Sequence, residues 1–392
     1  MAGAFDMAGT PSESWLRRLA DRWLALRDRL LASPGFQRRA AGFALTRPVA
    51  RRRARELFDL VGGFAYSQVL LACVQLRVFQ ILADGPQALA LLAPRLGLTR
   101  EAARCLLDAA VALRLLGRRG GERYGLGPLG APMVNNTAVE AMVLHHAALY
   151  ADLADPVSML RAAPSSRAAS ALSRYWAYEA AHGCADDAVE TTGNRSAVQT
   201  YSELMAASQP LVADEILDAF PLQSSRCLLD VGGGDGSFLI SAGRRAPALQ
   251  LMLFDLPAVG PLARARLAQA GLAARARVVT GSFLDEPLPL GADVVSLVRV
   301  IHDHDDGPAM TILQAVRAAL PSGGTLLLAE PMADTPGAEA VGAYFGFYLR
   351  AMGRGRPRSA DELTRMLQRA GFACVQQRRT RQPLQAQLLV AS

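Results

Sequence analysis

The sequence predicts an α/β protein in which a doubly wound domain with a parallel sheet follows a mainly helical region. Two observations predict this fold class. From Ser196 onward, short apolar runs alternate with helix-like segments, as in parallel strands joined by crossover helices. One of these runs ends in the glycine-rich loop Gly232–Gly236, and open α/β sheets bind nucleotide-like cofactors at such a loop. The candidate strands are 226–231, 249–255, 276–280, 292–299, 325–330, 373–379 and 385–391, and the last two fit an antiparallel hairpin.

The 392-residue chain is long enough for two or three domains, and its 51% apolar content argues against disorder. We divide it into an arm (1–56), a helical domain (57–195) and the sheet domain (196–392). It has no long uncharged apolar run and no signal-peptide pattern, so we expect a cytoplasmic protein without a membrane span. Five scattered cysteines without metal-type spacing predict reduced, buried thiols: Cys73, Cys105, Cys184, Cys227 and Cys374.

The net charge of +7 is concentrated near the N-terminus. Residues 1–55 hold twelve arginines against four acidic residues, a balance of +8 that leaves the rest of the chain near −1. Within this arm, residues 14–31 are a candidate amphipathic helix. Such a helix suits peripheral contact with the inner membrane, and it also suits packing on the protein body or across a dimer. Its apolar positions recur at helical spacing and are Trp15, Leu19, Trp23, Leu26 and Leu30.

The region from Leu57 to about Gly193 is predicted to be mainly helical. Within it, residues 89–99 end one helix, Glu101–Leu116 forms the next with Thr99 as its N-cap, and Gly117–Leu126 fits a hairpin. This order is typical of a winged helix, which either binds nucleic acid or serves as a structural or dimerisation module. The second helix is apolar around much of its circumference, so we expect it to be buried and expect no nucleic-acid partner.

The glycine loop does not fit a dinucleotide. A dinucleotide fingerprint needs G-x-G-x-x-G, and although Gly234 and Gly236 supply two glycines, position 239 is leucine. The loop instead has acidic neighbours, because Asp230 ends the strand and Asp235 lies in the turn. Asp255 ends the next strand, where an acid accepts hydrogen bonds from ribose hydroxyls. Acids at this place disfavour a pyrophosphate and suit a cofactor with an ammonium and a sulfonium, such as S-adenosylmethionine.

A candidate catalytic base follows the strand 292–299. His302 lies just past the carboxyl end of this strand, at the sheet edge that faces the cofactor, and a histidine can accept a proton near neutral pH. Glu330 ends the next strand and can hydrogen-bond the far ring nitrogen of His302. The run 302–306 (His-Asp-His-Asp-Asp) has two other interpretations, a site for a divalent metal or a solvated turn before a helix. Because neighbouring side chains on a turn diverge, we expect no metal.

Taken together, these residues resemble the metal-independent S-adenosylmethionine-dependent O-methyltransferases of the caffeic acid and acetylserotonin type. The resemblance covers about residues 57–392 and rests on the segments 230–236, 254–257 and 299–303 followed by Glu330. It implies a Rossmann-like cofactor-binding domain, a winged-helix domain that builds a homodimer, and His302 as the general base supported by Glu330. The cofactor contacts expected from the loop and the resemblance are Asp230, Gly232, Gly234, Asp255, Gly281, Ser282, Phe283 and Arg299.

The chain departs from the family pattern at three places. The usual Gly-Asp-Phe after the third strand is Gly281-Ser282-Phe283, so a hydroxyl replaces an acidic contact on the adenine side. The usual tryptophan after His-Asp is His304, and Pro357 stands where a second glutamate often flanks the base. These departures leave Glu330 alone to orient His302.

Four segments resemble the branch of this family that methylates acyclic carotenoids of the hydroxyneurosporene and demethylspheroidene type: 205–210, 281–283, 303–306 and 344–353. The helix-like segment 341–353 crowds large apolar side chains, which either form a core stripe or line a site for a long polyene. The candidate substrate contacts are Trp176, Tyr344, Phe347, Tyr348 and Met352, with Tyr178, His145 and His146 as further candidates.

The resemblance therefore implies O-methylation of a hydroxyl on a lipophilic, acyclic carotenoid. Two alternatives share the scaffold, namely a phenol or polyketide O-methyltransferase and a C-methyltransferase of bacteriochlorophyll synthesis. A winged-helix nucleic-acid-binding protein is an alternative of a different class, and the near-neutral charge of residues 56–392 argues against it.

Overall fold

The structure is a computed structural model that describes residues 11–162, 170–172, 209, 212–382 and 386–392. The chain divides into two units, Met1–Ala131 and Pro132–Ser392. Residues 137–161, which the sequence analysis assigns to the helical domain, group with the sheet. The three-part division at residues 56 and 195 stays a prediction.

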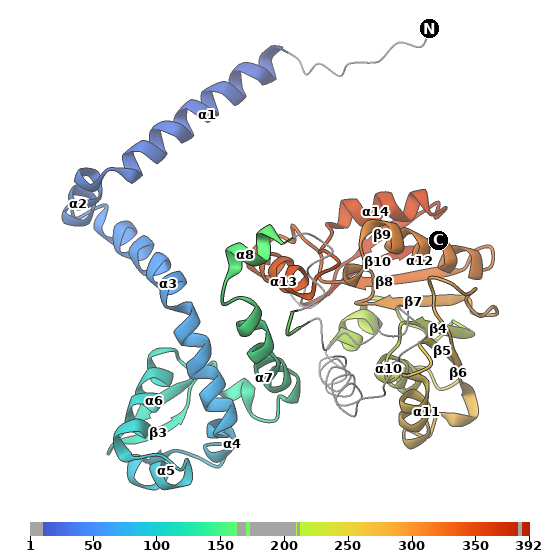
Figure 1. The fold of residues 1–392 in the computed structure, drawn as a ribbon, viewed down its shortest axis with the longest axis horizontal. Coiled ribbons are helices and arrows are strands. Elements are labelled where there is room, and N and C mark those ends of the chain that lie inside the picture. Colours follow the sequence, from blue (N-terminus) through green and yellow to red (C-terminus); the bar gives the residue numbers. More distant parts are fainter. Residues whose placement is uncertain (1–10, 163–169, 173–208, 210–211, 383–385) are drawn as a thin grey trace. The chain divides into compact units, whose positions relative to one another are not determined.

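The first unit is mainly helical and contains one small sheet (Figure 1). Thr99 accepts a hydrogen bond from the backbone N–H of Ala102 at 3.2 Å, which confirms the predicted N-cap. Strands β2 and β3 form the predicted antiparallel hairpin, and the identification of a winged helix stays a prediction. The elements are α1 (Pro11–Ala32), α2 (Pro34–Gly42), α3 (Arg47–Gln75), α4 (Val78–Ile81), β1 (Gln87–Ala88), α5 (Leu89–Arg95), α6 (Arg100–Ala112), β2 (Leu116–Arg119) and β3 (Arg123–Leu126), with strand order β1-β3-β2.

Helix α6 is buried on one face, through Ala103, Leu107 and Ala110, and not around most of its circumference. Cys105 is exposed on its outer side, and Cys374 is exposed just before the edge strand of the large sheet. The prediction of uniformly buried thiols is therefore wrong for these two positions. The four cysteines in the described residues are free, while Cys184 lies outside them.

Helix α3 is long and little buried. By length and composition it could cross a membrane, since its apolar window reaches a mean hydropathy of 1.6 with 11% of the window buried. One such helix is weak evidence for a span, because a helix that packs against other protein passes the same test. Leu57, Leu60, Val61 and Phe64 are exposed at spacings of three and four residues and form one stripe along this helix.

The second unit is built on a seven-stranded sheet with the order β6-β5-β4-β7-β8-β10-β9. Strands β4 to β8 are parallel, and β10 runs antiparallel between β8 and β9, as expected for a terminal hairpin. The chain order reverses between β4 and β7, which makes their carboxyl ends the switch point where such sheets bind ligands. The strands are β4 (Cys227–Val231), β5 (Gln250–Asp255), β6 (Ala276–Thr280), β7 (Val294–Val298), β8 (Thr325–Glu330), β9 (Val375–Arg378) and β10 (Gln387–Ala391).

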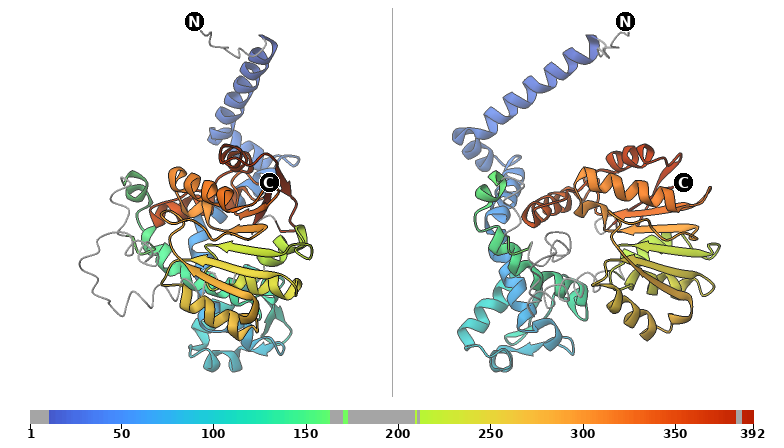
Figure 2. Two further views of the ribbon diagram at one scale, coloured as in Figure 1. Left: turned by 90° about the vertical axis from the view of Figure 1, so that its right-hand side faces the viewer. Right: turned by 45° about the vertical axis from the view of Figure 1, so that its right-hand side comes forward.

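Helices cover both faces of this sheet (Figures 1 and 2). Neighbouring strand residues, such as Leu228 and Leu229, point to opposite faces and join different hydrophobic clusters. One cluster includes α12 and α14, and the other includes α10, α11 and the helical residues 212–219. The helices are α7 (Thr137–Asp152), α8 (Pro156–Arg161), α10 (Ser237–Arg245), α11 (Gly260–Gln269), α12 (Asp306–Ala319), α13 (Glu339–Met352) and α14 (Ala360–Arg369). The predicted helix at 201–220 lies partly outside the described residues.

Candidate active site

The glycine loop joins β4 to α10 at the switch point. Gly232, Gly234 and Gly236 have φ values of 68°, 57° and 83°, a region that residues with a Cβ rarely adopt. A Cβ at Gly232 would lie 2.9 Å from the side chain of Val300, whereas a Cβ at Gly234 would meet nothing within 4 Å. The loop is therefore tight against Val300 and open at Gly234.

Asp255 braces this loop from the end of β5. Its Oδ2 accepts a hydrogen bond from the Gly234 N–H at 2.7 Å, and its Oδ1 accepts one from the Leu256 N–H at 2.7 Å. Asp235 has a local role, because its Oδ1 accepts from the N–H and hydroxyl of Ser237 and its Oδ2 lies 3.2 Å from Arg266. Asp235 therefore also holds the start of α10 and pairs with Arg266, and its expected part in favouring a cationic cofactor stays a prediction.

Asp230 is fully buried beside these acids. Its Oδ1 accepts a hydrogen bond from the Ser296 hydroxyl at 2.6 Å, and its Oδ2 has no hydrogen-bond partner among the described residues. Burial, together with the charges of Asp255 and Asp235, raises the pKa of Asp230 to about 7, and burial also raises the pKa of Asp255. Buried carboxylates with raised pKa values are stabilised by a nearby cation. The site therefore fits a positively charged cofactor such as S-adenosylmethionine.

Position 282, after β6, is serine instead of the family's aspartate, but two acidic side chains contact this serine. The hydroxyl of Ser282 donates to Asp285 at 2.8 Å, and its backbone N–H donates to Glu286 at 3.2 Å. A Cβ at Gly281 would lie 2.9 Å from both the Glu286 carboxylate and the Phe254 ring, so a side chain there would displace one of them. The sequence analysis missed both acids, although they follow Ser282 within four residues.

Two further predicted cofactor contacts lie near the same strand ends. Phe283 packs edge-on against His304 with ring centroids 5.5 Å apart, and burial lowers the pKa of His304 to about 4. Arg299 adopts a φ of 58° directly after β7, and its guanidinium donates to Gln209 at 3.2 Å. A non-glycine residue held in this conformation is characteristic of functional sites.

His302 is buried between two carboxylates. Its Nδ1 hydrogen-bonds Glu330, as predicted, and its Nε2 lies 3.2 Å from Asp303. Burial lowers the pKa of His302, but Asp303 and Glu330 outweigh burial, so this pKa is raised above its ordinary value. Burial raises the pKa of Asp303 to about 6. The sequence analysis gave Asp303 no role of its own.

The segment after α13 holds the loop that carries His302. Arg358 is 2% exposed and donates to the carbonyl oxygens of Ile301 and His304 at 2.8 and 2.7 Å. The Arg356 N–H donates to the carbonyl oxygen of His302 at 2.9 Å. This brace comes from the segment in which Pro357 replaces the family's second glutamate. Buried Arg358 therefore holds the backbone of the loop that carries His302. The family's glutamate would instead be expected to contact His302 itself.

Helices α7 and α13 are joined by two histidine–tyrosine pairs. His145 Nε2 lies 2.9 Å from the Tyr348 hydroxyl, and His146 Nε2 lies 2.7 Å from the Tyr344 hydroxyl. Burial lowers the pKa of both histidines, that of His145 to about 4, so both rings are neutral at physiological pH.

The ring of Phe345 links the histidine–tyrosine pairs to His302. Phe345 packs edge-on against Tyr344 and against His302, with centroids 5.2 and 6.1 Å apart. Among the other predicted substrate contacts, Phe347 is 43% exposed and Met352 is buried in the cluster that includes Leu149. Trp176 and Tyr178 lie outside the described residues.

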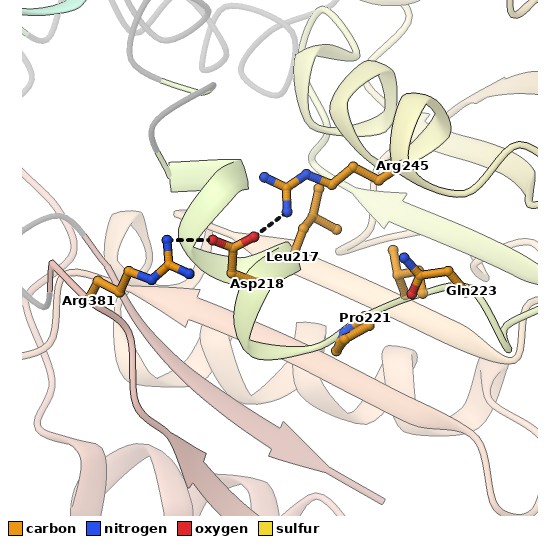
Figure 3. A pocket seen from close by; sticks show the side chains of 7 residues that line it. Leu217, Asp218, Pro221, Gln223, Arg245 and Arg381 are labelled. Carbon is orange, nitrogen blue, oxygen red and sulfur yellow. Dashed lines mark hydrogen bonds and ion pairs between the residues drawn. The ribbon is translucent and has the colours of Figure 1, made fainter.

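Two other features bear on the site's chemistry. Within the described ranges, no group of three or more His, Cys, Asp or Glu side chains is arranged to hold a metal ion. A cavity of about 450 Å³ lies between residues 217–223, Arg245 and Arg381 (Figure 3). Both of its arginines pair with Asp218, and it contains none of the predicted site residues. The predicted catalytic and cofactor residues lie instead at the strand ends around His302.

Comparison with known proteins identifies the family of this chain. Residues 150–373 match the model of an O-methyltransferase domain, and residues 58–136 match an O-methyltransferase dimerisation domain. The chain belongs to the O-methyltransferase family. It is 45% identical to the demethylspheroidene O-methyltransferase of Cereibacter sphaeroides over 88% of each chain, and 33% identical to the acetylserotonin O-methyltransferase of Mus musculus over 86% of this chain and 88% of the relative.

Solved structures agree with the fold. The human N-acetylserotonin methyltransferase, solved in complex with S-adenosylmethionine, superposes with a TM-score of 0.69 at 24% identity, covering 86% of this chain and 97% of that one. Mitomycin 7-O-methyltransferase superposes with a TM-score of 0.70 at 22% identity, covering 88% and 99%. The chain is thus an S-adenosylmethionine-dependent O-methyltransferase, and its dimerisation domain supports a homodimer. The exposed stripe of α3 begins at the first residues of that domain.

Proposed function

We propose that this O-methyltransferase methylates a hydroxyl group of an acyclic carotenoid of the demethylspheroidene or hydroxyneurosporene type. The observation that carries the proposal is the 45% identity to a demethylspheroidene O-methyltransferase over 88% of both chains. A second relative with the same name, from Rhodobacter capsulatus, is 41% identical over 86% of this chain and 81% of its own length. Identity to the acetylserotonin enzyme is lower, at 33%.

The cofactor contacts in this proposal surround the strand ends. Gly232 and Gly234 form the turn, which is open at Gly234, Asp255 accepts from ribose hydroxyls, and Asp230 adds negative charge. Gly281, Ser282 and Phe283 flank the adenine side, and Arg299 completes the set. When bound, S-adenosylmethionine supplies an electrophilic methyl group for transfer to the acceptor oxygen.

His302 is the general base of this proposal. Glu330 receives the Nδ1–H of His302, which fixes the tautomer whose Nε2 can accept a proton. As the acceptor oxygen gains the methyl group, its O–H bond breaks and the proton passes to Nε2. The Asp303 carboxylate lies 3.2 Å from that nitrogen. In this proposal the acceptor hydroxyl replaces the carboxylate beside Nε2 before the methyl group is transferred. An aliphatic hydroxyl is weakly acidic, so proton removal lags methyl transfer.

The acceptor lies along α13 in this proposal. Tyr344, Phe347, Tyr348 and Met352 belong to this helix, whose Phe345 contacts His302. The two histidine–tyrosine pairs satisfy one another, so they offer ring surfaces to an apolar chain and few unpaired polar groups. Trp176 is a further candidate contact.

The enzyme reaches a lipophilic acceptor at the inner membrane through its N-terminal arm in this proposal, while the rest of the protein stays in the cytoplasm. The supporting observation is the arm's charge of +8 together with exposed tryptophan side chains.

One assay tests the substrate and the base together. Purified enzyme is incubated with methyl-labelled S-adenosylmethionine and separate hydroxycarotenoids, phenols and bacteriochlorophyll precursors. We expect label in the hydroxycarotenoid, and label only in phenols or only in pigment precursors would refute the substrate. Replacing His302 by Ala should lower kcat by about 10²- to 10⁴-fold with cofactor affinity unchanged. Full turnover of that variant would refute the base.

A further inference from the structure

Helix α1 carries most of its large apolar side chains on one narrow face, with Leu24 and Leu31 outside it. With about 100° per residue, Trp15, Leu16, Leu19, Trp23, Leu26 and Leu30 fall within an arc of about 100°. All six side chains are exposed, Trp23 to 66%. We call this set the α1 stripe. An exposed stripe of this size on a soluble protein marks a surface that meets another apolar phase.

The charges of α1 are arranged around this stripe. Arg18, Arg22 and Arg29 border one side of it and Arg27 borders the other, each within about 60° of the stripe on the helix circumference. The acidic residues Asp21 and Asp28 lie on the opposite side, together with Arg17. Arg27 pairs with Asp28 at 2.7 Å, so Arg18, Arg22 and Arg29 form the basic side of the stripe.

The α1 stripe lies outside the family's dimerisation domain. That domain begins at residue 58, within α3, and includes Leu60, Val61 and Phe64 of the exposed stripe on α3. Helix α1 ends at Ala32, well before it. Aromatic side chains bordered by arginines match the boundary of an anionic bilayer, where tryptophan lies among the headgroups and arginine pairs with phosphate.

We propose that the α1 stripe lies in the interface of an anionic lipid bilayer, with Arg18, Arg22 and Arg29 on the headgroup phosphates and Asp21 and Asp28 turned to water. This inference rests on the arm–membrane contact proposed above and assigns it to one face of one helix. It also orients α1, because the helix axis then lies parallel to the membrane plane.

Vesicle flotation of the full-length protein tests the inference without any methyl transfer. We expect flotation with phosphatidylglycerol-containing vesicles, weaker flotation with phosphatidylcholine alone, and a loss at high salt. The double variant Trp15→Ser/Trp23→Ser should lose flotation, while Leu24→Ser on the opposite face should keep it. Replacing Arg18, Arg22 and Arg29 by Gln should lower the partition coefficient roughly a hundredfold, at about fivefold per arginine. The matched change Arg17→Gln should alter it less than twofold.

Tryptophan fluorescence provides a second readout, because two of the three tryptophans of the chain lie in the α1 stripe. Anionic vesicles should shift the emission to the blue. If Trp15→Ser/Trp23→Ser instead dissociates a dimer and leaves flotation intact, the stripe is a protein interface and the inference is overturned. Flotation that survives deletion of residues 1–55 would refute the arm's membrane role altogether, and methylation of carotenoids could still hold.

Discussion

Glu330 holds both His302 and the backbone that carries it. One carboxylate oxygen of Glu330 accepts hydrogen bonds from the N–H groups of Val300 and Ile301 at 3.0 and 2.7 Å, and the other contacts Nδ1 of His302. A single buried side chain therefore contacts both the loop backbone and the imidazole ring. The remaining nitrogen of His302 is left to face Asp303.

The pH dependence of catalysis should follow the carboxylates around His302. The base must be neutral to accept a proton, and its pKa is raised because Asp303 and Glu330 outweigh burial. We therefore expect kcat/KM to rise with pH through a value above 6.5. Asp303→Asn removes one raising charge and should move this limb to lower pH. The control Asp361→Asn, on the exposed side of α14, should leave the pH dependence of kcat/KM unchanged. If Asp303→Asn also leaves it unchanged, His302 is not the group that causes it.

Arg358 should contribute more to stability than its neighbour Arg356. Both pair with Asp306, but Arg358 is buried and also donates to two carbonyl oxygens of the base loop. We expect Arg358→Met to lower the free energy of unfolding by about 1.5–3 kcal/mol because buried carbonyls lose a charged donor. Arg356→Met should cost at most about 1 kcal/mol, as for an exposed ion pair. Urea denaturation measures both, and equal losses would contradict the assigned brace.

Gly355 should be required for the position of His302. It has a φ of 74°, and a Cβ there would lie 2.2 Å from the carbonyl oxygen of His302. Gly355→Ala should displace the base loop and lower kcat at least tenfold while cofactor affinity is kept. Gly323→Ala is a matched control with a φ of 76° and nothing within 4 Å of the added Cβ. It should cost about 1–2 kcal/mol of stability and leave kcat intact, so equal kcat losses would disprove a specific effect.

The two histidine–tyrosine hydrogen bonds should contribute to the free energy of unfolding independently of each other. Tyr344→Phe leaves the buried ring of His146 without its partner and should lower the free energy of unfolding by about 1 kcal/mol or more. Combined with His146→Leu, the second change should cost less than it does alone. The crossed combination of Tyr344→Phe with His145→Leu should be more nearly additive. Thermal or urea unfolding of the single and double variants measures the coupling, and additivity in the matched pair would contradict the assigned bond.

The sequence predicted the parts of the fold that depend on local pattern. The strand from 292 to 299 and the one ending at Glu330 were placed within about two residues, since apolar runs end where polar site residues begin. The contact between Glu330 and His302 was also predicted, because adjacent parallel strands end side by side.

Contacts set by tertiary packing could not be predicted in this way. Arg358 reaches Ile301 across 57 positions, and His146 reaches Tyr344 across 198. Nothing in the local sequence distinguishes either side chain from a surface residue. The ion pair of Asp235 with Arg266 could not be predicted for the same reason, since Arg266 comes from α11, the next helix along the chain.

The position of Asp303 beside His302 has a consequence for how the enzyme responds to its surroundings. A histidine whose pKa is raised holds a proton in a share of the molecules near neutral pH, and those molecules cannot accept another. In the proposed mechanism the solvent proton and the acceptor hydroxyl compete for one nitrogen of His302, so we expect protons to act as competitive inhibitors against the acceptor. Mild acidification would slow methylation through the active site itself, without a separate regulatory site.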